Sequence, residues 1–416
     1  MLIIKLITIF IGTIILINDV KMFTKTKRIT INFGLECVIY FFYYIPLICD
    51  LFIGRPTYKR YFKGFIESYS NFETELIYCL IIIYILYIFH KYNLKRKDEI
   101  DINFEDNKYT TFISLMIFFV IIGLLVYIVC SIDNELWKEI FSYNMRNIYT
   151  SEAILLKNLA FVLILMSLIF IVIGDSNLWL KTFLMFPIIL FAFFLNGKRT
   201  AVFLGVFGLL FIVIIKKMIK NKYKLVALIL FVSIMLGCYI DYYGKNVTLV
   251  DDGYTSYRIN FGRDDTLKMT IYRELNNNKI LEYRGQTMIF YFTFFIRRSV
   301  WKNKPFPFAT YFTASLVELD GIKDLGWNMT TSIFDETIAN FGFIGIIFLP
   351  FIMEKVISFF IKRNRGILGK EIVILGAINL ILLIAVQASA FIYFYILHIL
   401  LVAIYDIKNK IKINNK

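Results

Sequence analysis

Residues 110–132 read TTFISLMIFFVIIGLLVYIVCSI, an apolar run without a charged side chain. A helix needs roughly 17 to 25 such residues to cross a bilayer, so this run is long enough to span a membrane. Comparable runs lie at about residues 2–19, 31–53, 74–90, 153–173, 178–196, 200–215, 225–241, 340–361, 371–388 and 389–406. We therefore predict an all-α polytopic integral membrane protein with about eleven transmembrane helices, in a range of about ten to twelve.

The composition indicates the same class of protein. Hydrophobic residues make up 59% of the chain and aromatic residues 18%, and the mean hydropathy is +0.68. Soluble domains do not reach such values, which require most helices to face lipid or each other. Because no internal repeat and no low-complexity linker interrupts the pattern, we expect a single membrane domain over residues 1–416.

The distribution of lysine predicts the orientation of the chain. The first apolar run lacks a small-residue cleavage site and is followed by basic residues, which is typical of a retained helix rather than a removed signal peptide. If those basic residues are cytoplasmic, the Lys-rich segments at 91–108, 216–224, 362–370 and 408–416 fall on the same side. The N-terminus is then outside and the C-terminus inside. Lysine beside anionic lipid headgroups accounts for the net charge of +15, so we expect no nucleic-acid partner.

Cysteine and histidine give little sign of a metal site or a cofactor. All five cysteines lie within or at the ends of apolar runs, with no paired spacing and no histidine nearby. The only two histidines are His90 and His398. The simplest interpretation of each is an interfacial or hydrogen-bonded helix residue, although an ionisable group at membrane depth also suggests a functional role. We therefore predict neither a metal ion nor a cofactor.

One long and mostly polar stretch, residues 241–340, is predicted to be an external loop. Within it, residues 287–296 (TMIFYFTFFI) are strongly apolar but too few to span, so an interfacial or re-entrant segment is expected. Arg284, Arg297 and Arg298 flank this segment and would hold guanidinium groups at the depth of lipid phosphates. The alternative is ordinary snorkelling of flanking arginines to the membrane surface.

A second group of cations is predicted on the same side of the membrane. Residues 196–200 read NGKRT and join two apolar runs with almost no polar loop, which holds Lys198 and Arg199 at the outer membrane face. A charge at membrane depth costs about 2.5 to 3.5 kcal/mol on insertion scales, so an offsetting partner is expected. A lipid diphosphate fits, because arginine binds phosphate oxygens bidentately and lysine adds a point charge. The alternative is a short turn whose charges reach the interface.

Asp335 and Glu336 immediately precede the apolar run 341–350. A carboxylate within hydrogen-bond reach of a sugar hydroxyl is the usual base when that hydroxyl attacks an anomeric carbon, and nearby arginines stabilise a departing diphosphate. We predict such a catalytic role and favour Glu336, the inner residue. The alternative for one of the two acids is a position at a helix N-terminus or an ion pair with Arg298.

Three short motifs carry a resemblance to a known family. They are GKRT at 197–200, RRSVWKNKPFP at 297–307, and Gly326-Trp327 followed by Thr330-Thr331 and by ETIANFG at 336–342. Together with the many helices and one large external loop late in the chain, these motifs resemble the Wzy-type O-antigen and capsular oligosaccharide repeat-unit polymerases of bacteria. The likeness covers nearly the whole chain.

The resemblance implies a C-type glycosyltransferase fold in the bacterial cytoplasmic membrane, with its active site on the outer face. Such an enzyme transfers a growing glycan from undecaprenyl diphosphate to the non-reducing end of an incoming lipid-linked repeat unit, without a metal. Its expected partners are this lipid-linked oligosaccharide, membrane lipids, a chain-length regulator and a flippase. The implied site has Lys198, Arg199, Arg284, Arg297 and Arg298 at the diphosphates, Glu336 or Asp335 at the acceptor, and Trp301, Trp327 and Tyr311 at the sugars.

Two other functions are compatible with parts of the pattern. An O-antigen ligase-like enzyme would transfer finished glycan to a terminal acceptor, but the related ligases carry a histidine in their external loop and residues 241–340 contain none. A flippase for lipid-linked oligosaccharide would also place cations in a helix bundle. It would line a cavity open to both sides and often show repeated halves, whereas the cations here gather on one predicted face.

Overall fold

The structure is a computed structural model of the chain. It describes residues 1–26, 30–59, 62–95, 108–142, 145, 148, 150–173, 177–197, 199–215, 228, 230, 234, 237, 252–319 and 327–414. All regular elements within these residues are helices, and no strand occurs among them. The prediction of an all-α protein is therefore confirmed for this part of the chain.

Eight of the described helices are long and apolar enough to cross a membrane. They span Leu2–Thr26, Ile31–Phe52, Phe72–Lys95, Thr111–Ser131, Glu152–Val172, Leu178–Asn196, Ile333–Ile361 and Leu368–Ala385. Residues 199–215 and 392–414 are also helical but are not among the eight, and the run at 225–241 lies almost wholly outside the described residues. The protein is thus a polytopic helical membrane protein, and the total of about eleven spans stays a prediction.

The chain divides into two compact units. Unit 1 comprises residues 1–100 and 238–416, and unit 2 comprises residues 101–237. Unit 2 contains α6 (Lys108–Ser131), α7 (Asn134–Phe141), α8 (Ser151–Val172), α9 (Leu178–Asn196) and α10 (Arg199–Ile215). Within it, α6, α9 and α10 each pack against α8. Gly208 of α10 lies so close to α8 that a Cβ atom would come within 2.5 Å of the Leu168 side chain, which is the close approach that small residues allow between membrane helices.

Unit 1 holds most of the described helices. They are α1 (Leu2–Thr26), α2 (Ile31–Ile39), η1 (Tyr40–Tyr44), α3 (Ile45–Phe52), α4 (Lys63–Ser70), α5 (Phe72–Lys95), α12 (Gly253–Phe261), α13 (Arg263–Leu275), α14 (Gln286–Thr293), α15 (Phe308–Leu316), α16 (Ile333–Ile361), α17 (Gly366–Ala385), η5 (Ala388–Phe391) and α18 (Ile392–Asn414). The second span is α2, η1 and α3 in succession. Its middle is a π-helical turn directly before Pro46, whose missing N–H interrupts the regular ladder of hydrogen bonds.

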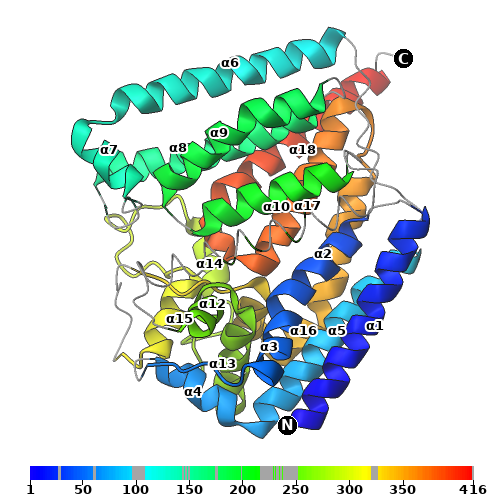
Figure 1. Ribbon diagram of the computed structural model, residues 1–416, viewed down its shortest axis with the longest axis vertical. Helices are drawn as coiled ribbons and strands as arrows, with labels where there is room; N and C mark the ends of the chain where they lie inside the picture. The colour runs from blue at the N-terminus through cyan, green and yellow to red at the C-terminus, as the bar shows by residue number, and fades with distance from the viewer. Residues whose placement is uncertain are drawn as a thin grey trace. The chain divides into compact units, whose positions relative to one another are not determined.

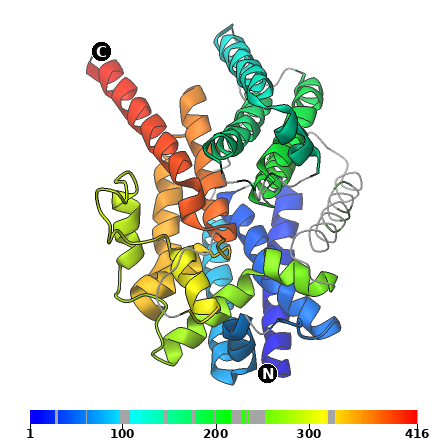
Figure 2. The same ribbon diagram turned by 90° about the vertical axis from the view of Figure 1, so that its left-hand side faces the viewer.

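The long helices of unit 1 run alternately between two ends, as Figures 1 and 2 show. At the first end, Lys5 of α1 lies 3.5 Å from carboxylate oxygens of both Asp50 of α3 and Glu75 of α5. At the second end, Asp19 of α1 contacts His90 of α5. The start of α2 and the later part of α16 also meet near the second end, through a bond from Asn32 to Glu354.

The Lys-rich segments of unit 1 adjoin its second end. Lys21 and Lys25 lie in the last turns of α1, Lys95 ends α5, and Arg363 after α16 forms a 2.8 Å ion pair with Asp406 of α18. These helix directions agree with the prediction that the Lys-rich segments of this unit share one side. Which side faces the cytoplasm stays a prediction.

Much of the polar stretch at 241–340 is folded and helical, not a loose loop. Its described part begins at Asp252 and contains α12 to α15, and α13 packs against α4, α5 and α16. Met269 of α13 lies so close to Gly64 of α4 that a Cβ atom there would come within 2.7 Å of the methionine sulfur. Phe65, Phe308 and Phe312 continue this apolar core between α4, α13 and α15. The stretch therefore forms a packed layer on the first end of unit 1.

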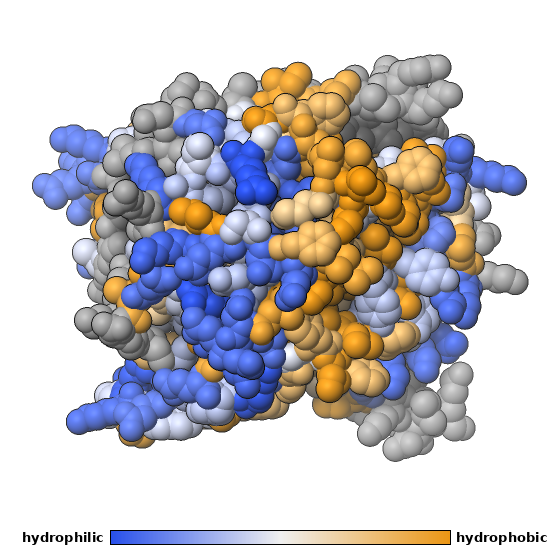
Figure 3. Space-filling model, turned by 90° about the horizontal axis from the view of Figure 1, so that it is seen from below, coloured by the Kyte–Doolittle hydropathy of each residue, from blue (hydrophilic) through white to orange (hydrophobic). Residues whose placement is uncertain are grey.

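The apolar segment predicted at 287–296 forms α14 and the turn after it. Two of its large side chains point away from the protein, since Phe292 is 80% exposed and Phe295 is 69% exposed, whereas Tyr291 points inward. This exposure is compatible with the expected interfacial segment, whose contact with lipid stays a prediction. Viewed from below, hydrophilic and apolar areas lie side by side on the surface (Figure 3), as is usual where parts of a surface meet water and others meet lipid.

Candidate active site

Glu336 is a fully buried carboxylate held in the first turn of α16. One carboxylate oxygen accepts a 2.6 Å hydrogen bond from the Thr287 hydroxyl, and the other accepts a 2.9 Å bond from the Tyr291 hydroxyl. Both donors lie on α14, one turn apart, which explains why they reach the same side chain. Burial and the adjacent carboxylate raise the pKa of the Tyr291 phenol, so it stays protonated and donates.

Two further residues complete the surroundings of Glu336. The Asn340 amide donates 2.7 Å to the Thr287 hydroxyl and 2.8 Å to the Glu336 backbone carbonyl, which fixes the donor that holds the carboxylate. Tyr395 of α18 interacts electrostatically with Glu336, and its buried hydroxyl has no hydrogen-bond partner within the described part of the chain. A carboxylate has about four acceptor positions, so Glu336 retains capacity for a donor that a substrate would bring.

Asp335 has different contacts from its neighbour. Its carboxylate accepts a 2.6 Å bond from the backbone N–H of Ser332, and the Ser332 hydroxyl accepts from Phe334 N–H, which together form a capping box at the start of α16. Asp335 is fully buried in this arrangement. The structure therefore favours the alternative interpretation of Asp335, which is that of a residue at a helix N-terminus. A catalytic role for either acid stays a prediction.

We expect Asp335→Asn to retain function, because the amide oxygen of asparagine still accepts the bond from Ser332. Asp335→Ala removes that bond and should destabilise the protein by about 0.5 to 2 kcal/mol, the usual cost of a lost cap. Glycan chain length on a gel and thermal unfolding in detergent measure the two effects. Short glycans from a stable Asp335→Asn protein would assign the base to Asp335 instead.

Arg284 supports a break in α16. Gly342 interrupts that helix with φ 66° and ψ −163°, and this leaves carbonyls of the preceding turn without their helical donors. The Arg284 guanidinium donates to two of them, Ile338 O at 3.1 Å and Ala339 O at 3.0 Å, and it also pairs with Glu274. Its side chain is 38% exposed. In the structure Arg284 thus stabilises the turn that follows Glu336, and its diphosphate contact stays a prediction.

Gly342→Ala should destabilise the protein by about 1 to 3 kcal/mol, because glycine alone readily adopts this backbone conformation. Steric overlap is not the cause, since an added Cβ would lie 3.5 Å from the nearest Arg284 nitrogen. The melting temperature in detergent measures the effect. Gly123→Ala is the matched control, because Gly123 has a helical backbone in α6 and open space around an added Cβ. Equal melting temperatures for Gly342→Ala and the unaltered protein would contradict this account.

Arg298 and Lys304 tie together the loop that follows α14. The Arg298 guanidinium donates to the carbonyls of Lys304 at 2.7 Å and Pro305 at 3.0 Å, and it stacks 3.5 Å from the centre of the Phe306 ring. The Lys304 ammonium donates 2.9 Å bonds to the carbonyls of Phe294 and Ile296. These contacts position the loop. Arg298 forms no ion pair with Asp335, whose carboxylate serves the helix cap.

Arg297 lies beside Arg298 but is exposed, and no described residue forms an ion pair or hydrogen bond with its side chain. Of the three arginines predicted around α14, it is the one whose guanidinium is not engaged by the protein. Arginine presents a planar group of five donors that matches phosphate oxygens. The diphosphate role predicted for Arg297 is therefore compatible with its placement and stays a prediction.

The three predicted sugar-binding residues differ in exposure. Trp327 is 42% exposed, and Trp301 is partly buried. Tyr311 is only 4% exposed, its ring packs against Phe306, and its hydroxyl accepts a 3.1 Å bond from the Phe306 backbone N–H. A ring in this position belongs to the apolar core of α15. Its placement does not favour a sugar contact, which stays a prediction.

Lys198 and the side chain of Arg199 lie outside the described residues. The turn that they form belongs to unit 2, whereas Glu336 and α14 belong to unit 1. The predicted approach of this turn to Glu336 therefore stays a prediction. The turn itself follows α9, whose C-cap Gly197 adopts the left-handed conformation with φ 65°.

A buried ionic cluster, defined as Lys5, Asp50, Glu75, Arg258, Asp264, Asp265 and Lys268, lies at the first end of unit 1. The Arg258 guanidinium is fully buried and contacts Asp50, Asp264 and Asp265. The Lys268 ammonium lies 3.3 Å from Glu75 and 3.4 Å from Asp264. The cluster joins α12 and α13 to α1, α3 and α5.

The charge of this cluster does not favour the binding of an anion. It contains three cations against four carboxylates, so its formal charge is already negative. Burial, with Asp265 also nearby, raises the pKa of Asp264 to about 7 despite Arg258 and Lys268, which allows a proton to offset part of the excess. None of these residues is among the site residues expected from the sequence. The sequence does not indicate their contact, because the acidic residues at 50 and 75 are far in sequence from the basic residues at 258 and 268.

No protein-family model matches the chain, and neither the curated proteins nor the solved structures include a significant match to it. The resemblance to repeat-unit polymerases therefore rests on the short motifs and the arrangement of apolar runs.

Proposed function

We propose that this protein is a membrane glycosyltransferase that polymerises lipid-linked oligosaccharide repeat units. It transfers a growing glycan from a polyprenyl diphosphate carrier to the non-reducing end of an incoming lipid-linked unit. The polytopic helical architecture, the motif resemblance and the placement of Glu336 support this proposal together. The single observation that carries it is the Glu336 carboxylate, buried at the start of a membrane-spanning helix and oriented by Thr287 and Tyr291.

The proposed step assigns a defined role to Glu336. An acceptor sugar hydroxyl attacks the anomeric carbon of the growing glycan, and its proton passes to the Glu336 carboxylate. The bond between that carbon and the diphosphate oxygen breaks, and the electron pair leaves with polyprenyl diphosphate. A base within hydrogen-bond reach is suited to this proton transfer, and the Thr287 and Tyr291 donors hold it in one rotamer.

The diphosphate is the second group that the site must hold. Arg297 is the exposed arginine beside α14 with no described partner, and we assign it the first contact. Arg284 and Arg298 each use both terminal nitrogens for protein acceptors. Nη1 of Arg284 donates to two carbonyls, whereas Nη2 of Arg284 and both terminal nitrogens of Arg298 each keep a second hydrogen. Both arginines contribute positive potential close to the carrier. The roles expected for Lys198 and Arg199 stay predictions.

Deletion of the gene in its host tests the proposal. We expect lipid-linked glycans to accumulate as single repeat units accessible from the outer face of the membrane, because units are still exported but not joined. Full-length glycan remaining on the lipid carrier would indicate the ligase function instead. Single units protected from a membrane-impermeant oxidant would indicate a flippase. Unchanged glycans would exclude all three functions.

A further inference from the structure

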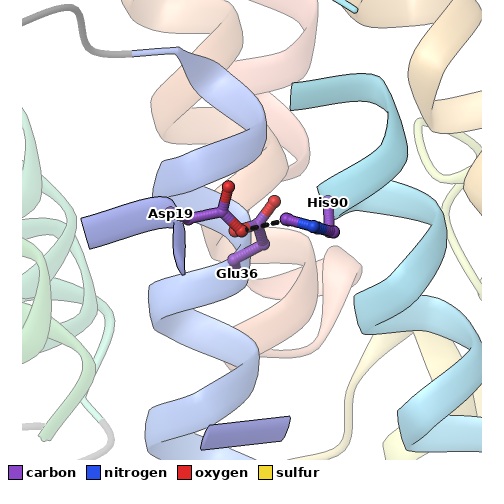
Figure 4. Close-up of side chains that lie close together, drawn as sticks. All are labelled: Asp19, Glu36 and His90. Carbon is purple, nitrogen blue, oxygen red and sulfur yellow. Dashed lines mark hydrogen bonds and ion pairs between the residues drawn. The ribbon is translucent and has the colours of Figure 1, made fainter. Parts of the chain in front are cut away.

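Three side chains at the second end of unit 1 form a cluster that the proposed reaction does not use. Asp19 of α1, Glu36 of α2 and His90 of α5 bring oxygen and nitrogen atoms within 4.8 Å of one another (Figure 4). Asp19 and Glu36 are fully buried, and the His90 side chain is 14% exposed. The cluster shares no residue with the surroundings of Glu336.

The charges of this cluster are not balanced by the protein. The His90 Nδ1 atom lies 2.5 Å from Asp19 Oδ2, and among the described residues it is the only basic group that pairs with Asp19. Neither carboxylate oxygen of Glu36 accepts a hydrogen bond from a described donor, although both are buried, and the group beside it is the second acid, Asp19. Two buried carboxylates thus face at most one positive charge. Buried acids in spanning helices are costly unless a counter-charge is present.

The surrounding residues orient the cluster. The Asn93 amide donates a 2.9 Å bond to Asp19 Oδ1, and the Asn93 carbonyl oxygen accepts a 2.5 Å bond from the Thr30 hydroxyl. Thr30 also caps α2, the helix that carries Glu36. A second layer of hydrogen bonds that fixes the orientation of a carboxylate is characteristic of metal sites. The cluster therefore combines nitrogen and oxygen donors, an unpartnered buried acid and an outer layer that orients it.

We propose that Asp19, Glu36 and His90 bind one divalent transition-metal ion, for which Zn²⁺ is the best match. Zinc accepts imidazole nitrogen and carboxylate oxygen as ligands, and a charge of 2+ neutralises both acids while His90 remains neutral. Binding opens the contact between Asp19 and His90 and provides the partner that Glu36 lacks. The ion joins α1, α2 and α5 at one end of unit 1 through three protein ligands. The sequence predicts no metal site, and this proposal revises that prediction.

Metal content and thermal stability of the purified, tag-free protein test this site. The protein in detergent is stripped with a chelator and dialysed against Zn²⁺, and bound metal is measured by mass spectrometry. We expect about one zinc ion per chain and a higher melting temperature with zinc than after stripping. Less than a stoichiometric amount of bound zinc, or a melting temperature that does not respond to it, would overturn the proposal.

Three variants show whether these residues are the ligands. Glu36→Gln and His90→Gln should each lose the bound zinc. The Glu36→Gln protein should still fold without metal, because the substitution removes one of two neighbouring acids. Its loss of zinc would then result from the missing ligand and not from unfolding. His398→Gln is the matched control and should retain zinc, since both His398 nitrogens lie within hydrogen-bond distance of α17, at Asn379 and Ile372 O. Zinc retained by both ligand variants would exclude this site.

Cobalt substitution separates this site from the cysteines. Co²⁺ bound by nitrogen and oxygen gives weak visible bands, whereas cysteine thiolates add an intense charge-transfer band in the near ultraviolet. We expect the first spectrum, because the ligands that we propose include no sulfur. A strong thiolate band that persists in Glu36→Gln would overturn the proposal and assign the metal to the cysteines.

Discussion

Glu336→Gln should abolish polymer and leave products at a single repeat unit. The amide keeps the size of the side chain, and its oxygen can still accept a bond from Thr287 or Tyr291, but it cannot take a proton from an acceptor hydroxyl. Loss of a positioned base lowers a rate by about 10²- to 10⁴-fold. Because each added unit requires this step, the effect on chain length should be close to complete. Gel analysis of lipid-linked glycans measures it.

Glu354→Gln is the matched control for this prediction. Glu354 lies on the same helix, is 7% exposed and accepts a 3.1 Å bond from Asn32, which glutamine also accepts. Its substitution should leave chain length unchanged. Tyr291→Phe should reduce polymer less than Glu336→Gln, because it removes one orienting donor and leaves the carboxylate. Normal chain length from a folded Glu336→Gln protein would remove Glu336 from the proposed mechanism.

Arg258→Met should prevent accumulation of folded protein. Arg258 is fully buried and contacts Asp50, Asp264 and Asp265, so its loss leaves three carboxylates with far less positive charge around them. Removal of one partner from a buried ion pair costs about 3 to 5 kcal/mol, because the remaining charge stays buried without compensation. That loss is comparable to the whole stability of many proteins. Yield and thermal unfolding, followed by size-exclusion chromatography, measure it.

Two comparisons make this expectation specific. Arg297→Met removes an exposed arginine without a described partner, so it should not change the melting temperature. Arg258→Met combined with Asp265→Asn should recover part of the yield, because it removes one of the uncompensated charges. If Arg258→Met alone gave protein of normal yield and melting temperature, the cluster would not hold α12 and α13 in place.

The adjacent acids at 335 and 336 show why sequence could not assign their roles. Successive residues on a helix point roughly 100° apart, so neighbours in sequence face different surroundings. One side chain turns back to the backbone of Ser332, and the other meets α14. Both side chains carry the same charge and are adjacent in the sequence, so the sequence does not distinguish them. Glu336 is favoured as the inner residue, but the contacts that distinguish the two acids come from residues 45 to 49 positions away.

The arginines illustrate the same limit. Arg284, Arg297 and Arg298 are equivalent as sequence signals around an apolar segment. In the folded protein, Arg284 donates to carbonyls at a helix break and Arg298 to carbonyls of its own loop, while Arg297 remains exposed. Whether an arginine is available to a ligand depends on which acceptors surround it. Those acceptors are mostly backbone carbonyls, and their positions are set by the fold.

The sequence by itself determined the class of the protein and the positions of most spanning helices. The run predicted at 178–196 is the helix Leu178–Asn196, because a long apolar run has one stable conformation in a bilayer, where every backbone group must be paired within its own segment. Only the tertiary structure decided which polar residues meet. The acids and bases of the ionic cluster, and Asp19, Glu36 and His90, come from separate helices. Their contacts depend on helix packing, which hydropathy does not encode.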